Sequence, residues 1–221
     1  MDAIRTEHDP RYANIAEHLA AAGWCVHDEF LDGELTQRLA RECRLLWQQG
    51  EMRRAAVGKG DDARIRDQVR RDLVRWVDPT TPTLGQHGWL HHLEQLRLAL
   101  NRMLYLGLFE YEGHLAVYPA GAFYRRHLDR FQGSAERRIS VVFYLNDAWT
   151  DDDGGQLRIY LDGDQATPFV DIAPVAGRLV TFVSDRFEHE VLAAKRPRMS
   201  LTGWYRTRPS GPGAILPERS A

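Results

Sequence analysis

The hydrophobic positions in the first half of the chain recur at helical spacing and predict three helices. These helices are expected at 9–22, 32–47 and 83–106, with Gly23, Gly50 and Gly107 after them. Two short apolar stretches, 24–26 and 69–77, are typical of strands. Residues 51–68 carry glycines and mixed charges without an apolar period, which predicts either a surface loop or a lid over a cleft.

From Glu110 onward the hydrophobic residues recur at every second position instead of at helical spacing, which predicts strands. Eight strands are expected, at 111–118, 123–127, 137–145, 156–160, 167–172, 178–183, 189–191 and 199–206. Many short strands with regular turns between them favour a double-sheet jelly roll or barrel. Helices followed by strands indicate an α+β fold, in which the N-terminal helices pack on one sheet of the jelly roll or barrel.

No repeat and no linker divides the chain, so residues 1–221 are expected to form a single domain. Within it, 1–109 is the helical support with the mobile lid loop near 51–68, and 110–207 is the jelly-roll core. Residues 208–221 are rich in Pro, Gly and Ser, which predicts a flexible tail.

Composition narrows the class of protein. Lys and Arg number 29 against 31 Asp and Glu, so the net charge of -2 argues against a nucleic-acid partner. The two cysteines, Cys25 and Cys43, form neither a disulfide framework nor a zinc-binding spacing. Charges throughout the first thirty residues exclude a signal-peptide pattern, and no apolar stretch reaches bilayer length. A cytoplasmic monomer without a membrane partner is expected.

The sequence His127-Leu128-Asp129 puts two metal-binding side chains on one face of a predicted strand, because residues i and i+2 point the same way. A third ligand, His189, comes from a distant strand. Two histidines and one carboxylate are the ligand set of facial-triad Fe(II) sites, which keep three positions open. The chain has nine histidines, and an HxD arises by chance in roughly half of such sequences, so the motif alone is weak.

The candidate metal ligands are accompanied by Arg198, on the strand that follows His189. Strand alternation puts a row of side chains on one face: Arg198, Ser200, Thr202 and Trp204. Arginine binds a carboxylate through two parallel hydrogen bonds, so Arg198 suits a dicarboxylate cosubstrate whose other end chelates the iron. Tyr118 and Tyr144 add hydroxyl donors from opposing strands.

This constellation resembles the iron/2-oxoglutarate dioxygenases, and among them the HIF-type prolyl hydroxylases with their bacterial relatives that hydroxylate elongation factor Tu. The matching segments are YPAGAFYRRHLDRF (118–131), VVFYLNDAW (141–149), GGQLRIY (154–160) and DRFEHEVLAAKRPRMSLTGWY (185–205). The resemblance implies an α+β fold with a double-stranded β-helix (jelly roll) core and N-terminal helices packed on one sheet. It also implies that His127, Asp129 and His189 bind iron and act in catalysis together with Arg198.

The resemblance also assigns roles around the cosubstrate. Arg198 is implied to hold the distal carboxylate of 2-oxoglutarate, and Tyr144 to donate to the same group. Tyr118 is implied to lie near the cosubstrate and the iron, and Thr202 and Trp204 to line the pocket. Nucleic-acid dealkylating dioxygenases carry a second arginine at the position of Trp204, and collagen-type prolyl hydroxylases carry lysine at that of Arg198. Both differences favour the HIF-like branch.

The substrate side of the resemblance rests on VRRDLVRWVDP (69–79). It implies substrate contacts by Arg70, Asp72 and Trp76, with Arg137 as a further substrate-contacting arginine. The loop 51–68 corresponds to a mobile finger over the active site, which favours the lid interpretation. This chain departs from the family at Arg71, which stands where the family has the glycine of an Arg-Gly-Asp.

The implied function is a dioxygenase that uses Fe(II), 2-oxoglutarate and O2 and has ascorbate as a candidate cofactor. It would 4-hydroxylate a prolyl residue of a protein, with elongation factor Tu as the implied substrate and succinate and CO2 as co-products. Two alternatives stay open: a hydroxylase of a small molecule or free amino acid, and a non-catalytic iron- or oxygen-sensing module. The Arg70–Asp72 region favours a protein substrate, and the intact ligand set with Arg198 argues against the sensing module.

Overall fold

The computed structural model of the 221-residue chain describes residues 9–56, 64–129, 137–161 and 168–208. Its three α-helices are α1 (Pro10–Ala22), α2 (Gly33–Gln48) and α3 (Leu84–Leu104). Each begins after a side chain that accepts from a backbone N–H of the first turn: Asp9, Asp32 and Thr83. No helix of the described ranges is long and apolar enough to cross a membrane.

The end of α3 differs from the prediction. The helix stops at Leu104, because Tyr105 adopts a left-handed conformation (φ 53°), rather than at Gly107. The Asn101 side chain explains the early stop: its amide donates to the carbonyl oxygen of Leu108 (2.8 Å) and its oxygen accepts from the Leu108 N–H (2.7 Å). These two bonds hold the chain folded back toward the next strand.

All eight strands predicted in the second half are present. Their bounds are β4 (Leu108–Tyr118), β5 (Tyr124–His127), β6 (Arg137–Tyr144), β7 (Leu157–Tyr160), β8 (Phe169–Ile172), β9 (Leu179–Val183), β10 (His189–Val191) and β11 (Arg198–Thr207). The first half adds β1 (Trp24–His27), β2 (Arg53–Arg54) and β3 (Leu73–Trp76). A short 3-10 helix, Asp151–Asp153, lies in the turn before β7.

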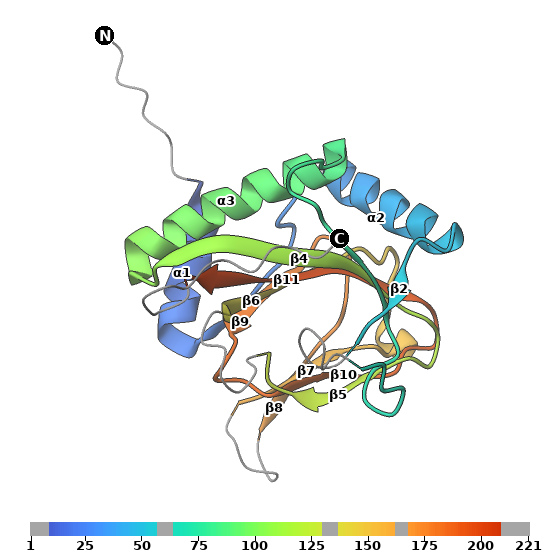
Figure 1. The fold of residues 1–221 in the computed structure, drawn as a ribbon. Helices are drawn as coiled ribbons and strands as arrows, with labels where there is room; N and C mark the ends of the chain where they lie inside the picture. The colour runs from blue at the N-terminus through green and yellow to red at the C-terminus, as the bar shows by residue number, and fades with distance from the viewer. Residues whose placement is uncertain (1–8, 57–63, 130–136, 162–167, 209–221) are drawn as a thin grey trace.

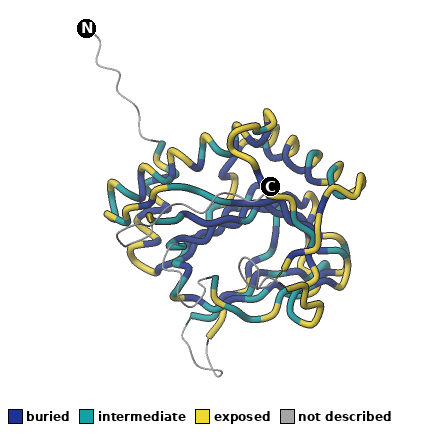
Figure 2. The backbone as a smooth tube through the Cα atoms, in the orientation of Figure 1, coloured by how far each residue is buried: buried dark blue, intermediate teal, exposed yellow. Residues whose placement is uncertain are grey.

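The strands form two sheets that face each other, with the helices on the outer face of the larger one (Figure 1). The larger sheet has the order β1-β9-β6-β11-β4-β3-β2, and the smaller has β5-β10-β7-β8. One apolar cluster lies between the helices and the larger sheet, and a second lies between the two sheets. Figure 2 shows the resulting buried band along the central strands. The predicted jelly roll with helices on one sheet is confirmed.

The predicted strand 69–77 is shorter in the structure. Only Leu73–Trp76 pairs with β4, as β3. Before it, the Arg71 N–H donates to Phe123 O (3.1 Å) and the Arg125 N–H donates to Val69 O (2.9 Å). Residues 69–71 therefore lie beside the start of β5, where Arg70 is opposite Tyr124. The chain then enters the larger sheet at Leu73.

The lid and the tail fall partly outside the described residues. Of the predicted lid, 57–63 is not described, and the described part contains the short edge strand β2. Of the predicted tail, 209–221 is not described. The division into support, lid, core and tail stays a prediction.

Candidate metal centre and cosubstrate pocket

The two candidate histidine ligands face each other across a strand pair. His127 is the last residue of β5 and His189 is the first of β10, and their Cα atoms are register partners. Because directly opposed residues share one face of a sheet, the two rings lie close, with centroids 4.3 Å apart. The ring of Tyr124 stacks on that of His127 with centroids 3.6 Å apart, and the rings of Phe182 and His189 meet edge to face with centroids 4.7 Å apart.

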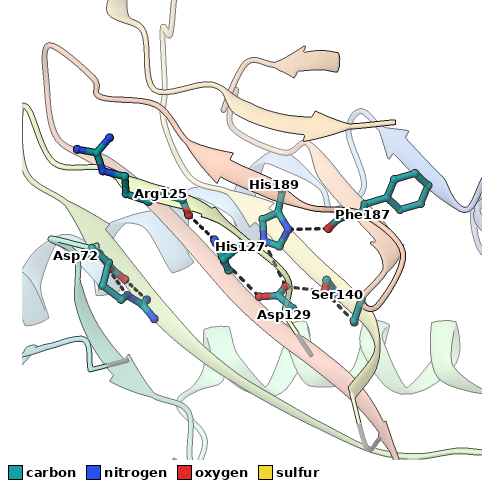
Figure 3. Close-up of polar contacts among 9 residues, drawn as sticks. Asp72, Arg125, His127, Asp129, Ser140, Phe187 and His189 are labelled. Atoms are coloured by element: carbon teal, nitrogen blue, oxygen red, sulfur yellow. Dashed lines mark hydrogen bonds and ion pairs between the residues drawn. The ribbon is translucent and has the colours of Figure 1, made fainter. Parts of the chain in front are cut away.

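Backbone carbonyls orient both imidazoles. Nδ1 of His127 lies 2.7 Å from the carbonyl oxygen of Arg125, and Nδ1 of His189 lies 3.2 Å from that of Phe187 (Figure 3). A carbonyl only accepts, so each Nδ1 carries the proton and each Nε2 keeps its lone pair. Nε2 of His127 is buried without a hydrogen-bond partner among the described residues. This pattern is the usual support of a metal-binding histidine.

Asp129 completes the cluster just beyond the end of β5. Its Oδ1 lies 3.6 Å from Nε2 of His127, and its Oδ2 lies 3.5 Å from Nε2 of His189. Burial raises the pKa of the Asp129 carboxyl, but the adjacent imidazoles of His189 and His127 and the hydrogen bond from Ser140 outweigh burial and hold that pKa well below its usual range. Burial lowers the pKa of His189 to about 4. The site thus offers a carboxylate and a neutral imidazole near neutral pH.

The donor set fits a divalent iron ion. His127, Asp129 and His189 each offer one ligand atom, and these atoms all lie within 4.8 Å of one another. Nitrogen and oxygen donors without a cysteine match the facial triad of non-haem Fe(II) rather than a structural zinc site. The structure therefore brings together the three ligands that the sequence predicted.

Arg198 lines the same pocket as the three candidate ligands. It is the first residue of β11, is 1% exposed, and donates from Nε to the carbonyl oxygen of Gly155 (2.8 Å). Its guanidinium lies 5.1 Å from the ring centre of Tyr118 and 5.0 Å from that of Tyr144. Among the described residues no Asp or Glu side chain forms an ion pair with it. A buried cation without an acidic partner is costly, so this part of the pocket favours an anionic ligand.

The other predicted cosubstrate residues lie on the two strands beside β11 and farther along β11 itself. Tyr118, its register partner on β4, lines the pocket together with Thr202 and Trp204. Tyr144 lies one strand away on β6, opposite Ser200, and its hydroxyl is buried without a hydrogen-bond partner in the described structure. Burial raises the pKa of both tyrosines, so both hydroxyls stay protonated and can donate. Arg198, Thr202 and Trp204 of β11 line one pocket, as the predicted alternation of this strand requires.

The predicted substrate residues divide between the pocket and its surroundings. Arg70 lines the pocket and forms a two-bond ion pair with Asp72, whose side chain is fully buried (2.7 and 2.5 Å). The Arg70 guanidinium also lies over the Tyr124 ring at 4.3 Å. Arg137 lines the pocket as well, 3.5 Å from the ring centre of Trp204.

Trp76 lies outside the pocket. It is 53% exposed and contacts the pocket only through its neighbours: its ring centre is 4.9 Å from that of His114 and 6.4 Å from that of Trp204. Direct substrate contact by Trp76 therefore requires a substrate that extends beyond the pocket.

Four residues of the site were not identified from the sequence: His114, Tyr124, Ser140 and Ser184. His114 and Tyr124 line the pocket, while Ser140 and Ser184 connect to Asp129 by hydrogen bonds. Strand alternation carries a signal for two of them. His114 lies four residues before Tyr118, and Ser140 lies four residues before Tyr144, so each shares the face of a predicted pocket residue.

Comparison with known proteins agrees with this geometry. Residues 113–206 match the model of the 2OG-Fe(II) oxygenase superfamily. A prolyl-4-hydroxylase of Pseudomonas putida is 44% identical, with a TM-score of 0.80 over 89% of this chain and 100% of that structure. A prolyl hydroxylase of Trichoplax adhaerens, solved with a peptide of the oxygen degradation domain of hypoxia-inducible factor, is 25% identical with a TM-score of 0.77 over 89% of each chain.

A longer relative is the hypoxia-inducible factor prolyl hydroxylase of Caenorhabditis elegans. It is 31% identical over 217 residues, which cover 88% of this chain. The present chain spans 28% of the length of that protein.

Proposed function

This chain belongs to the 2OG-Fe(II) oxygenase superfamily, whose members use Fe(II), 2-oxoglutarate and O2, and from that premise we propose that it is a prolyl 4-hydroxylase acting on a protein. The observation that carries the proposal is one pocket that joins three iron-type ligands to a buried arginine, for which the described residues supply no acidic partner. The 44% identity to a Pseudomonas putida prolyl-4-hydroxylase supports the choice of proline as the target.

His127, Asp129 and His189 would hold the metal through Nε2, a carboxylate oxygen and Nε2. The contacts of both Nδ1 atoms with backbone carbonyls fix the imidazoles in the tautomer that such binding needs. The depressed pKa of Asp129 keeps it ionised over the physiological pH range. These side chains require no rearrangement of protons when the ion binds.

Arg198 would bind the distal carboxylate of 2-oxoglutarate. Its Nε is committed to the carbonyl oxygen of Gly155, so the terminal guanidinium nitrogens are the donors that remain for the ligand. The hydroxyl of Tyr144, which has no partner among the described residues, can donate to the same carboxylate. Iron and 2-oxoglutarate, once bound, supply the oxidative chemistry, in which one oxygen atom of O2 reaches proline and succinate and CO2 leave.

The protein substrate would enter beside Arg70 and Arg137. Both guanidiniums are held before the substrate arrives, Arg70 by Asp72 and Arg137 by Glu112 (2.8 Å). Preorganised donors of this kind lose little side-chain freedom when they bind backbone carbonyls of an extended peptide. The aromatic rings of Tyr124 and Trp204 beside them suit the apolar proline ring.

The partner that we propose is elongation factor Tu, because the matching sequence segments resemble the bacterial enzymes that hydroxylate it. Purified chain with Fe(II), 2-oxoglutarate and O2 would be incubated with elongation factor Tu and, separately, with cell extract. Mass spectrometry should find one oxygen atom added to a proline of elongation factor Tu, and His127→Ala should give neither this product nor succinate.

The other possible results separate the choice of partner from the substrate class and from the oxygenase activity. Oxygen on prolines of other proteins but not on elongation factor Tu would refute the partner and keep the enzyme class. Succinate formation driven by a free amino acid or another small molecule, with no protein product, would favour the small-molecule hydroxylase. Wild-type protein that binds Fe(II) and 2-oxoglutarate but never forms succinate would refute the oxygenase.

A further inference from the structure

We propose that a chain of two buried hydroxyls, from Ser184 to Ser140, holds the Asp129 carboxylate so that only its Oδ1 atom is free to bind the metal. This inference rests on the proposed metal site. It assigns Ser140 and Ser184 as positioning residues, which act on the ion only through Asp129.

The direction of the hydrogen bonds follows from the distances. Ser140 Oγ lies 2.7 Å from Asp129 Oδ2 (Figure 3). It also lies 2.9 Å from Ser184 Oγ. The carboxylate can only accept, so the single hydroxyl proton of Ser140 goes to Oδ2. Ser140 Oγ then accepts from the hydroxyl of Ser184. The two hydroxyls are thus ordered in one direction, toward Asp129.

Burial keeps water from replacing these bonds. Ser184 is fully buried and Ser140 is 1% exposed. Ser140 lies in the middle of β6, where its register partners are Trp204 on β11 and Phe182 on β9, so the strand pairing fixes its position. A hydrogen bond to a charged group in such a site contributes more than the same bond at the surface.

Ser184 connects the chain to the second ligand-bearing segment. It follows directly on β9, and its N–H donates to the carbonyl oxygen of Arg138 (3.0 Å) in β6. The turn that begins at Ser184 leads into β10 and therefore to His189. One pair of hydroxyls thus links the position of Asp129 to the segment that carries His189.

The consequence concerns the number of coordination positions. Oδ2 gives one lone pair to Ser140, whereas no hydrogen bond to Oδ1 is found among the described residues. Ligation through Oδ1 alone, with two imidazoles, uses three of six octahedral positions. A chelating keto acid takes two more, which leaves one position. If Asp129 turned so that both oxygens bound the ion, that last position would be lost. Ser140 opposes this turn because the turn would break its bond to Oδ2.

The test compares metal binding in four variants, with the metal alone and without 2-oxoglutarate. Anaerobic titration calorimetry with Mn(II) should give an affinity about 10- to 100-fold lower for Ser140→Ala, as for other losses of a hydrogen bond to a metal ligand. Ser184→Ala should lie between Ser140→Ala and the wild type, because it leaves the bond to Oδ2 in place. Ser140→Thr keeps the hydroxyl and should bind like the wild type.

The matched control is Thr181→Val. Thr181 is a buried hydroxyl residue of the neighbouring strand β9, and its Oγ1 has no hydrogen-bond partner in the described structure. Its register partner on β6 is Val141, next to Ser140. The substitution keeps shape and removes a hydroxyl, so Mn(II) affinity should not change. An equal loss in Thr181→Val and Ser140→Ala would show a general packing effect and overturn the inference.

A second measurement tests the single-oxygen ligation. The visible spectrum of Co(II) bound to Ser140→Ala should differ from that of the wild type, whereas Ser140→Thr and Thr181→Val should match it. An unchanged spectrum would refute control of the ligation mode even if affinity fell. If circular dichroism shows that Ser140→Ala does not fold, the Mn(II) affinity of Ser184→Ala becomes the test. A wild-type affinity in Ser184→Ala would then refute the inference.

The outcomes also separate this inference from the proposed function. Wild-type protein that binds neither Mn(II) nor Co(II) would refute the metal site itself. Wild-type binding with Ser140→Ala within about twofold of it would leave the metal site standing and refute only the hydroxyl chain, because the expected loss is at least about tenfold.

Discussion

Acidification should destabilise this protein through His114, a pocket residue that burial keeps uncharged. His114 lies on β4, is 4% exposed, and its Nδ1 has no hydrogen-bond partner in the described structure. Burial, followed by the charge of Arg70, lowers the pKa of His114 from 6.5 to about 3. In the unfolded chain the same imidazole titrates near 6.5, so below that pH the unfolded state binds the extra proton first.

The magnitude follows from the two pKa values. A group whose pKa is lower in the folded state contributes fully to stability above its unfolded pKa, and this contribution is lost as pH falls toward the folded pKa. Between pH 7.5 and pH 5 the free energy of unfolding should fall by about 2 kcal/mol because of His114 alone. The result changes little if the folded pKa is anywhere below 4, because the group then stays unprotonated in the fold at pH 5.

Urea denaturation of metal-free protein at the two pH values measures this loss. Other titrating groups also respond to acid, so the wild type is compared with His114→Leu, which cannot titrate at this position. The acid-induced loss should be about 2 kcal/mol smaller in His114→Leu than in the wild type. His87, an exposed residue of α3, provides the control His87→Leu, which should behave like the wild type. Equal acid-induced losses in wild type and His114→Leu would refute the reasoning.

Arg198→Lys should raise the KM for 2-oxoglutarate about 10- to 100-fold in a succinate assay, because lysine cannot form the two parallel bonds to a carboxylate; an unchanged KM would contradict the role of Arg198. Arg137→Ala should raise the KM for the protein substrate and leave that for 2-oxoglutarate unchanged, and the opposite pattern would place Arg137 at the cosubstrate. Gly203→Ala should lower the free energy of unfolding by about 1–3 kcal/mol in urea denaturation, because its Cβ would overlap the carbonyl oxygen of Glu112. Gly33→Ala, with no atom within 4 Å of the added Cβ, should not destabilise.

The sequence predicted most of the fold because its local signals agree with one another. The side chains of Asp9, Asp32 and Thr83 begin the three helices, as their residue types suggest. In the second half, hydrophobic residues at every second position predicted the ends of all eight strands to within about three residues. The alternation that predicted Arg198, Thr202 and Trp204 on one face of β11 holds because both neighbours of this strand pair with it in regular register over most of its length.

What could not be predicted depends on contacts between distant segments. The opposition of His127 to His189 is a matter of strand register, and one residue of slip would turn one ring to the other face. The early end of α3 depends on the Asn101 side chain reaching Leu108. The role of Ser140 was hidden for a different reason: alternation places Ser140 on the same face as Tyr144, but only the fold brings its hydroxyl to Asp129.

The charges in the pocket indicate why metal and cosubstrate belong together. Two of its three arginines are balanced within the protein: Arg70 by Asp72, and Arg137 by Glu112. Arg198 has no acidic partner among the described residues, and Asp129 faces two imidazoles rather than a cation. The protein therefore holds the buried positive charge of Arg198 and the largely buried negative charge of Asp129 in one pocket.

A dication at the histidines and a dicarboxylate reaching Arg198 add equal and opposite charge. The net charge of the pocket does not change, yet Asp129 and Arg198 each gain an opposite neighbour. Because an unbalanced buried charge costs several kcal/mol, each ligand should favour the binding of the other, and this coupling is reciprocal. A module that only sensed iron would need the carboxylate but not a buried arginine in the same pocket. The cost of keeping Arg198 buried therefore favours an oxygenase that binds a dicarboxylate over a module that binds metal alone.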